Sequence, residues 1–248
     1  MRVPDSDCEK ASMISCEFCS SANGGFSLGI GGRRFVIDAL HDGQRDTYAS
    51  LDPRQYVTLS RNIAFSDPTA ICFTHCHRDH FSRRLTEEYC GLYPAAELLL
   101  PEPFFPTQVV MTHCHEEFSW GDVTLHAFRT VHAGKEYKNV PHYSFIVSFS
   151  GKRVFVAGDA DVSDQTLLAA QLSGGCVDVA VLPFPWATLT RGRSLVTGSL
   201  RPKKLILNHL PKNDDYGYLT ALYRQMPLPD PIDTYCISEP FQFLSLYI

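Results

Sequence analysis

The sequence has no long hydrophobic run and no excess of basic residues. None of its segments approaches the length of a membrane span, and residues 1–8 lack the apolar core of a secretory signal. With 22 Lys and Arg against 27 Asp and Glu, the formal charge is −5, which provides no general basic surface for the phosphate backbone of a nucleic acid. We therefore expect a cytoplasmic protein without a membrane span and without a nucleic-acid partner.

Composition breaks, internal repeats and low-complexity linkers are also absent from the 248 residues. Hydrophobic residues make up 44% and charged residues 20% of the chain, which is ordinary for a globular protein with a sizeable core. We predict a single domain over 1–248, in which residues 1–23 form a polar N-terminal extension.

The nine cysteines are an odd number spread along the whole chain, which favours reduced thiols over a disulfide framework. Cys16 and Cys19 form a CxxC pair, but no second CxxC follows at zinc-ribbon spacing. A structural or incidental role is the favoured interpretation of this pair, and a redox or metal-binding role stays open.

Short apolar strands alternate with turn residues and helix patterns along the chain. Gly31-Gly32 and Ser150-Gly151-Lys152 each predict a tight hairpin turn, and a helix predicted at 82–90 is closed by Gly91. The predicted strands are 25–30, 33–40, 70–73, 97–100, 107–112, 123–129, 143–149, 153–157, 177–182, 204–207, 234–237 and 241–247, and further helices are predicted at 163–172 and 216–226. This order predicts an α/β fold in which sheets are sandwiched between helices.

The densest chemical signal is the run Thr74-His75-Cys76-His77-Arg78-Asp79-His80, which follows a short apolar strand and precedes a predicted helix. Three imidazoles and one carboxylate fall within six residues, at a turn where the backbone can direct them to more than one centre. Borderline divalent cations such as zinc accept these ligands, and an open coordination position is typical of catalytic ions. The run predicts a catalytic metal site.

This run resembles the HxHxDH signature of the metallo-β-lactamase superfamily, and the other motifs of that family follow in order. His132 resembles the third-motif histidine, Asp159 in Gly158-Asp159 the bridging aspartate, His209 the last histidine, and Asp38 the early aspartate at a strand end. The match covers about residues 24–210. The resemblance implies a four-layered αβ/βα sandwich and a metal-dependent hydrolase.

By the same resemblance, two divalent metal ions are implied, with zinc expected and manganese or iron as alternatives. The implied ligands are His75, His77 and His132 for the first ion, Asp79, His80 and His209 for the second, and Asp159 as a bridge. Two such ions lower the pKa of a shared water, which yields a bridging hydroxide near neutral pH. Asp79 would orient this water or accept its proton, and Asp38 would support a ligand imidazole through a hydrogen bond.

The remaining histidines fall into two groups. His41 and His142 are predicted to contact substrate, because each adjoins a segment that ends near the metals. His113 and His115 form a lone HxH with no following Asp-His, so a surface position is the favoured interpretation and substrate contact the alternative. Cys76 is expected to face away from the neighbouring ligands, because side chains alternate in an extended segment.

The predicted function is hydrolysis of a small ester, lactone or phosphoester. The strands before Gly158 and the lysine-rich segment before His209 look similar to the lactonase and phospholipase D-like branch of the superfamily, which includes L-ascorbate 6-phosphate lactonase. Two alternatives remain: a diiron redox or oxygen-handling protein, which Arg78 disfavours because diiron relatives usually have Glu there, and a non-catalytic metal-binding sensor module. A small-molecule substrate is the expected partner, and a homo-oligomer stays open.

Overall fold

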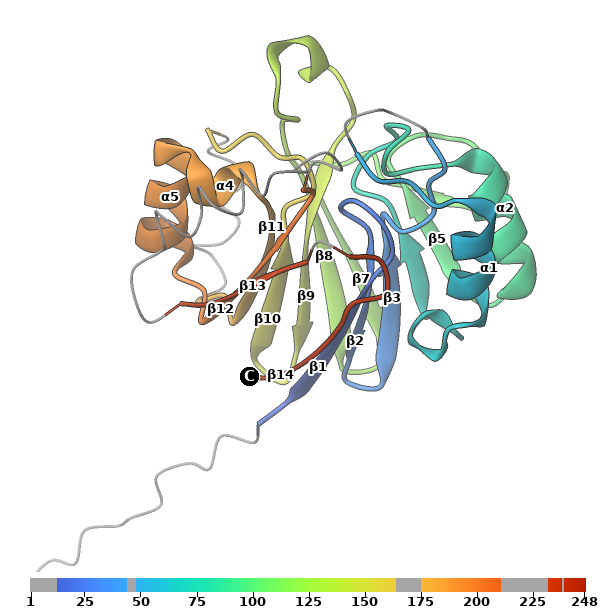
Figure 1. The fold of residues 1–248 in the computed structure, drawn as a ribbon, viewed down its shortest axis with the longest axis horizontal. Helices are drawn as coiled ribbons and strands as arrows, with labels where there is room; N and C mark the ends of the chain where they lie inside the picture. Colours follow the sequence, from blue (N-terminus) through green and yellow to red (C-terminus); the bar gives the residue numbers. More distant parts are fainter. Residues whose placement is uncertain (1–12, 44–47, 164–174, 211–231, 238) are drawn as a thin grey trace, which may run out of the picture.

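The chain folds into two seven-stranded sheets that pack face to face, with helices on the outer face of each (Figure 1). The computed structural model describes residues 13–43, 48–163, 175–210, 232–237 and 239–248. None of the helices in these ranges is long and apolar enough to cross a membrane. The arrangement is the predicted α/β sandwich of four layers.

The first sheet has the strand order β14-β1-β2-β3-β4-β5-β6 and is covered by α1 (Pro53–Arg61) and α2 (Arg83–Leu92). Its strands are β1 (Ser15–Ser20), β2 (Phe26–Ile30), β3 (Arg33–Ile37), β4 (Ala70–Cys72), β5 (Glu97–Leu100), β6 (Val109–Val110) and β14 (Phe243–Tyr247). A 3-10 turn, Ile63–Phe65, follows α1. From β3 to β6 the strands are parallel.

The second sheet has the order β13-β12-β11-β10-β9-β8-β7 and lies beneath α4 (Pro185–Thr188), α5 (Thr190–Leu195) and a π-helical turn, Val196–Leu200. Its strands are β7 (His115–Trp120), β8 (Val123–Arg129), β9 (Tyr143–Phe149), β10 (Lys152–Val156), β11 (Val179–Pro183), β12 (Lys204–Asn208) and β13 (Asp233–Cys236). A short 3-10 helix, Lys135–Tyr137, stands in the loop between β8 and β9.

Strand alternation explains the layers. In β3, Phe35 and Ile37 enter the cluster between the sheets, whereas Val36 joins the cluster under α1 and α2. In β11, Val181 faces the central cluster and Leu182 the cluster under α4 and α5. The central strands are apolar on both faces because each sheet is covered twice.

Both predicted hairpins are present, since Gly31 and Gly32 join β2 to β3 with φ values of 58° and 71°, and Ser150 and Gly151 join β9 to β10 with 50° and 78°. Other boundaries differ from prediction. The fold begins before residue 24: β1 lies within the predicted extension 1–23 and pairs with β2 and β14. Helix α2 continues through Gly91, because no positive φ breaks it there.

Several elements were not predicted, namely α1, β7 and the α4–α5 segment. Helix α1 starts at a capping box, in which Asp52 Oδ1 accepts hydrogen bonds from the backbone N–H groups of Arg54 and Gln55 at 2.7 and 2.8 Å. The predicted helices at 163–172 and 216–226 fall almost wholly outside the described residues.

Because α5 packs closely against α4, alanine substitutions at Gly192 and at Gly91 should have opposite effects on stability. A Cβ at Gly192 would lie 2.5 Å from the backbone oxygen of Trp186, whereas one at Gly91 would meet nothing within 4 Å. Gly192→Ala should lower the free energy of unfolding by about 1–3 kcal/mol through overpacking. Gly91→Ala should raise it by about 0.5–1 kcal/mol, because alanine loses less backbone entropy in a helix. Thermal unfolding of both variants checks this, and equal shifts would contradict the packing at Gly192.

Candidate metal centre

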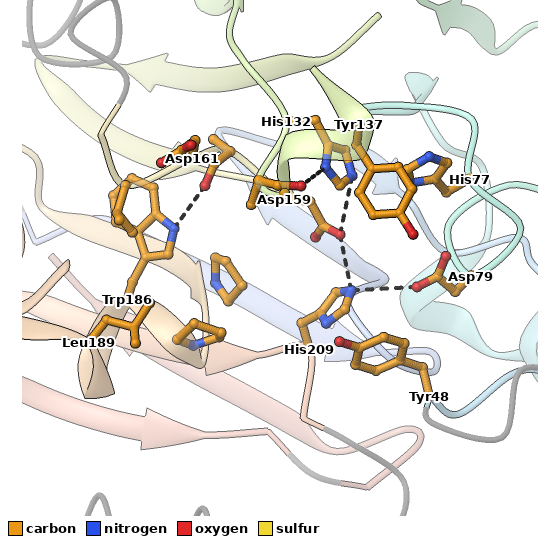
Figure 2. A pocket seen from close by; sticks show the side chains of 16 residues that line it. Tyr48, His77, Asp79, His132, Tyr137, Asp159, Asp161, Trp186, Leu189 and His209 are labelled. Atoms are coloured by element: carbon orange, nitrogen blue, oxygen red, sulfur yellow. Dashed lines mark hydrogen bonds and ion pairs between the residues drawn. The ribbon is translucent and has the colours of Figure 1, made fainter. Parts of the chain in front are cut away.

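The predicted ligands meet where strands of both sheets end (Figure 2). The first sheet contributes the loop after β4 with His75, His77, Asp79 and His80, and the second contributes His132 after β8, Asp159 after β10 and His209 after β12. A β-bridge between His132 and Ala160 holds the second-sheet loops side by side, with Ala133 N donating to Asp159 O at 2.8 Å.

The first predicted triad, His75, His77 and His132, presents ligand atoms that all lie within 4.8 Å of one another. Nε2 of His75 is 3.3 Å from Nε2 of His132. His75 is fully buried and His77 half-buried, and burial lowers the pKa of His77 to about 4. Neutral imidazole is the form that binds a metal.

The second predicted triad, Asp79, His80 and His209, satisfies the same 4.8 Å criterion. Nε2 of His80 is 3.1 Å from Nε2 of His209, and Asp79 Oδ2 lies 3.7 Å from the latter atom. All three residues are buried. Two triads of the predicted composition are therefore adjacent in space.

Asp159 lies between the triads. Its Oδ2 is 3.7 Å from His132 Nε2 in the first triad and 3.3 Å from His209 Nε2 in the second, while Oδ1 is 3.4 Å from His80 Nε2. Burial alone would raise the pKa of Asp159, but the facing His209 and His80 hold it well below its usual value. The carboxylate is thus ionised and reaches both triads, as the bridging position requires.

Asp38 determines the tautomer of one imidazole in each triad. It accepts hydrogen bonds from Thr74 N at 2.8 Å, from Thr74 Oγ1 at 2.6 Å and from His80 Nδ1 at 3.1 Å. Because the Thr74 hydroxyl donates to Asp38, it must accept from His75 Nδ1, which is 3.0 Å away. His75 and His80 therefore carry their protons on Nδ1 and present the lone pair of Nε2 to the site.

A divalent cation fits these donors. His132 Nδ1 donates to Ala133 O at 2.6 Å, so Nε2 of His132 also presents a lone pair, and it faces the lone pair of His75 at 3.3 Å. Two nitrogens bound to one tetrahedral zinc at about 2.0–2.1 Å are separated by about 3.3 Å. Asp159 Oδ1 is buried without a hydrogen-bond partner, which a cation would supply.

Asp38, His75 and His80 form a third group with metal-ligand spacing. Both oxygens of Asp38 are already engaged by Thr74 and His80, and Nδ1 of His80, which faces Asp38, carries a proton. Asp38 therefore supports the ligands from behind.

The lone pair of His80 Nε2 is available only when a metal is bound; in the absence of metal, this nitrogen would hold a second proton. Burial lowers the pKa of His80, but the carboxylates of Asp159 and Asp38 on either side raise it well above its usual value. Metal binding must displace this proton, since an imidazole coordinates through its lone pair.

Two residues of the site, Asp38 and His209, have a left-handed backbone conformation. Asp38 and His209 follow β3 and β12 with φ values of 50° and 56°, in the left-handed region that Asp and His tolerate better than most residues. Gly158, with φ of 58°, precedes Asp159, and a Cβ there would lie 2.8 Å from Thr74 and 2.9 Å from His142. Only glycine allows this close approach.

The structure argues against direct substrate contact by His41 and His142. Both are fully buried, and neither lines the cavity beside the ligands. His142 Nε2 accepts a hydrogen bond from Asp159 N at 3.0 Å while Nδ1 contacts Thr130 Oγ1 at 2.7 Å, so this ring fixes the Asp159 loop. His41 Nε2 donates to Ala22 O at 3.0 Å, which ties the Asp38 loop to the turn after β1. They support the site from behind.

A cavity of about 460 Å³ opens onto the ligands, and sequence reasoning missed several residues around it. Tyr137 lies edge-on to His77 and His132, with ring centroids 4.9 and 5.1 Å away, and Tyr48 lies 4.3 Å from His209 (Figure 2). Asn23 donates through Nδ2 to Asp79 O at 3.1 Å. Asn23 belongs to the segment predicted as an extension, and no spacing rule connects it or the tyrosines to the ligands.

The remaining cysteine and histidine signals lie outside the site. Cys16 and Cys19 are free and buried in different clusters, one between the sheets and one under α1 and α2, so they cannot act as a pair. Cys76 packs against the latter cluster, away from the ligands, as expected. His113 precedes the edge strand β7 and His115 begins it; both are exposed, and neither lines the cavity.

The role of Asp38 leads to a prediction about metal affinity. Asp38→Asn replaces one acceptor oxygen with a donor that faces Thr74 or His80, so at least one ligand tautomer is lost. Metal affinity should fall about 10–100-fold, the usual effect of removing such a supporting hydrogen bond. Competition with a chromophoric chelator measures it, and Asp122→Asn in the exposed β7–β8 turn is the matched control. Equal affinity of the two variants would contradict the role of Asp38.

Buried neutral histidines make the metal-free protein sensitive to acid. Burial lowers the pKa of His41 to about 4, whereas the ring has its ordinary pKa of 6.5 in the unfolded chain. The contribution to stability is therefore complete above pH 6.5 and is lost as the pH falls towards 4, by up to about 3 kcal/mol. Denaturant unfolding of chelated protein across this range measures the slope. His41→Gln should flatten it and His113→Gln should not; an unchanged slope in His41→Gln would refute the assignment.

No family model matches the sequence, and no curated protein matches it either. Solved structures do match. YhfI from Bacillus subtilis, described as a metallo-β-lactamase fold protein, has a TM-score of 0.61 at 11% identity, covering 94% of this chain and 99% of that one. An isothiocyanate hydrolase from Delia radicum gut bacteria has a TM-score of 0.63 at 14% identity, with 94% and 100% covered.

The diiron β-hydroxylase CmlA from Streptomyces venezuelae is similar as well, with a TM-score of 0.64 at 13% identity over 95% of this chain and 54% of that one. At such low sequence identities, the similarity shows a shared fold and nothing more. The two seven-stranded sheets, the helices outside them and the histidines at the strand ends agree with it. This chain has the metallo-β-lactamase fold.

Proposed function

We propose that this chain is a hydrolase that uses two divalent metal ions held by the two triads and bridged by Asp159. The observation that carries the proposal is the position of Asp159 Oδ2, which lies 3.7 Å from His132 Nε2 and 3.3 Å from His209 Nε2 at the floor of an open cavity. Each triad supplies three protein ligands, the number typical of a catalytic ion with an open position.

Bound divalent cations would lower the pKa of a coordinated water towards neutrality and polarise the carbonyl or phosphoryl oxygen under attack. The chain itself supplies orientation and proton transfer. Asp79 lines the cavity and is the residue to accept the proton of the attacking water. Asn23 fixes Asp79, because its Nδ2 contacts both the backbone oxygen and Oδ2 of Asp79, at 3.1 and 3.5 Å.

The hydrogen bonds behind the ligands reduce reorganisation during the reaction. Thr74 and Asp38 hold His75 and His80, and His142 holds the backbone of Asp159. Ligands fixed in this way keep the reacting groups in position, which is a main source of catalysis in preorganised sites.

A diiron oxygen-handling protein is the second candidate. Imidazole and carboxylate donors accept iron as readily as zinc, and the fold is shared with a diiron β-hydroxylase. Elemental analysis and the absorption spectrum of protein purified with and without air separate the candidates, since zinc is colourless and does not change oxidation state. We expect two equivalents of a redox-silent metal; an air-dependent iron spectrum would favour the second candidate.

Removal of Asp79 tests hydrolysis directly. Asp79→Ala should lower turnover of p-nitrophenyl acetate or bis(p-nitrophenyl) phosphate about 10²–10⁴-fold, because the proton acceptor and one ligand are lost. Asp122→Ala, on the exposed turn, should retain full activity. Metal-loaded protein that turns over neither compound, nor any lactone, would instead indicate a metal-binding sensor.

A further inference from the structure

The cavity beside the metal centre has two chemically different walls (Figure 2). The predicted ligands form one wall. The end of β11, the segment after it and the loop after Asp159 contribute the apolar lining residues Val162, Pro183, Pro185, Trp186 and Leu189, and Figure 2 shows Trp186 and Leu189 across the cavity from His77 and Asp79. An apolar wall that faces a polar one is typical of a site that orients a substrate by burying its non-reacting part.

Trp186 lies behind the apolar wall. It is 1% exposed, and its indole N–H donates to the backbone oxygen of Ala160 at 3.1 Å, so its single polar group is already satisfied. The indole therefore backs the wall as a buried apolar residue, and the exposed surface comes from Pro185 and Leu189. Leu189 connects α4 to α5 and forms the rim, with 53% of its surface exposed. Exposed leucine at the rim gains free energy when an apolar ligand covers it.

The charges away from the predicted ligands disfavour a substrate whose non-reacting arm is anionic. Besides Asp79 and Asp159, Asp161 lines the cavity, and its Oδ1 accepts hydrogen bonds from Ser163 N and Oγ at 2.8 and 2.7 Å. Among the lining residues that the structure describes, none is lysine or arginine. Arg191, close to Leu189 in sequence, is exposed and does not enter the wall. Away from the ions of the proposed function, the described lining therefore offers no cation to an anionic group of the substrate.

Resting on the proposed function, we infer that the substrate is an uncharged ester or lactone whose apolar arm lies against Pro185 and Leu189, with Trp186 behind them. Water adds to the carbonyl carbon, its proton passes to Asp79, and the carbon–oxygen bond to the leaving group breaks. The proton then passes from Asp79 to the leaving oxygen. The products are a carboxylic acid and an alcohol, or one hydroxy acid from a lactone.

Chain-length dependence tests the inference. For p-nitrophenyl esters of increasing acyl length, kcat/KM should rise about fourfold per added CH₂ until the apolar wall is covered. Leu189→Lys should flatten this series and increase the relative rate on bis(p-nitrophenyl) phosphate. Leu92→Lys is the matched control, because Leu92 is similarly exposed, 56%, but lies on α2 outside the cavity. A flat series, or faster turnover of the phosphodiester by the unmodified protein, would overturn the inference and leave the hydrolase intact.

Binding provides a second readout that needs no turnover. The chain has two tryptophans, so Trp120→Phe leaves Trp186 as the single tryptophan, which can be excited apart from the tyrosines at the red edge of its absorption. Methyl alkyl ketones of increasing length, which cannot be hydrolysed, should change its fluorescence with affinities that rise about fourfold per CH₂. Length-independent affinity would refute the apolar subsite. Length-dependent binding without turnover of any ester, lactone or phosphodiester would refute the hydrolase while the subsite stands.

Discussion

The position of the Asp38 carboxylate is the constraint on which the rest of the site depends. Its two oxygens receive three hydrogen bonds from Thr74 and His80, and through Thr74 they also determine the proton position of His75. One buried residue thereby sets the tautomer of an imidazole in each triad. A ring free to exchange its nitrogens would present an N–H to the cation half of the time, so the strained backbone at Asp38 is the local cost of two preorganised ligands.

The packing between the two sheets aligns the two halves of each triad. Local hydrogen bonds cannot do this, because each triad combines residues from both sheets. His75 and His80 come from the first sheet, and His132 and His209 from the second. Nε2 pairs across this boundary lie 3.3 and 3.1 Å apart, and a small shear between the sheets would break both. The central cluster of interdigitated aromatic and aliphatic side chains resists such a shear, since close-packed interiors are stiff.

Coordination chemistry and the spacing at a strand-to-helix turn drew attention to the run from His75 to His80, whereas His132, Asp159 and His209 were found only through the family resemblance; the structure brings all of them together. The positions of His41 and His142 could not be predicted, since adjacency to a ligand along the chain does not say which way a side chain points; both point into the protein. The pairing of β1 with β14 was equally hidden, because it joins Cys16 to Leu246, and sequence periodicity carries no information about such distant partners. The tyrosines reach the site through irregular loops, for which periodicity has no signal.

The predicted ligands alone do not define the reaction. Imidazoles and carboxylates in this arrangement suit hydrolysis and oxygen chemistry alike, since both need ions with open positions. Selectivity must then come from groups that touch only the substrate. In the inferred binding mode, these groups lie on α4 and on Leu189 between α4 and α5, a segment that contributes none of the predicted ligands. Changes in this short segment can alter the accepted substrate without disturbing a single bond around Asp38, because the two networks share no residue.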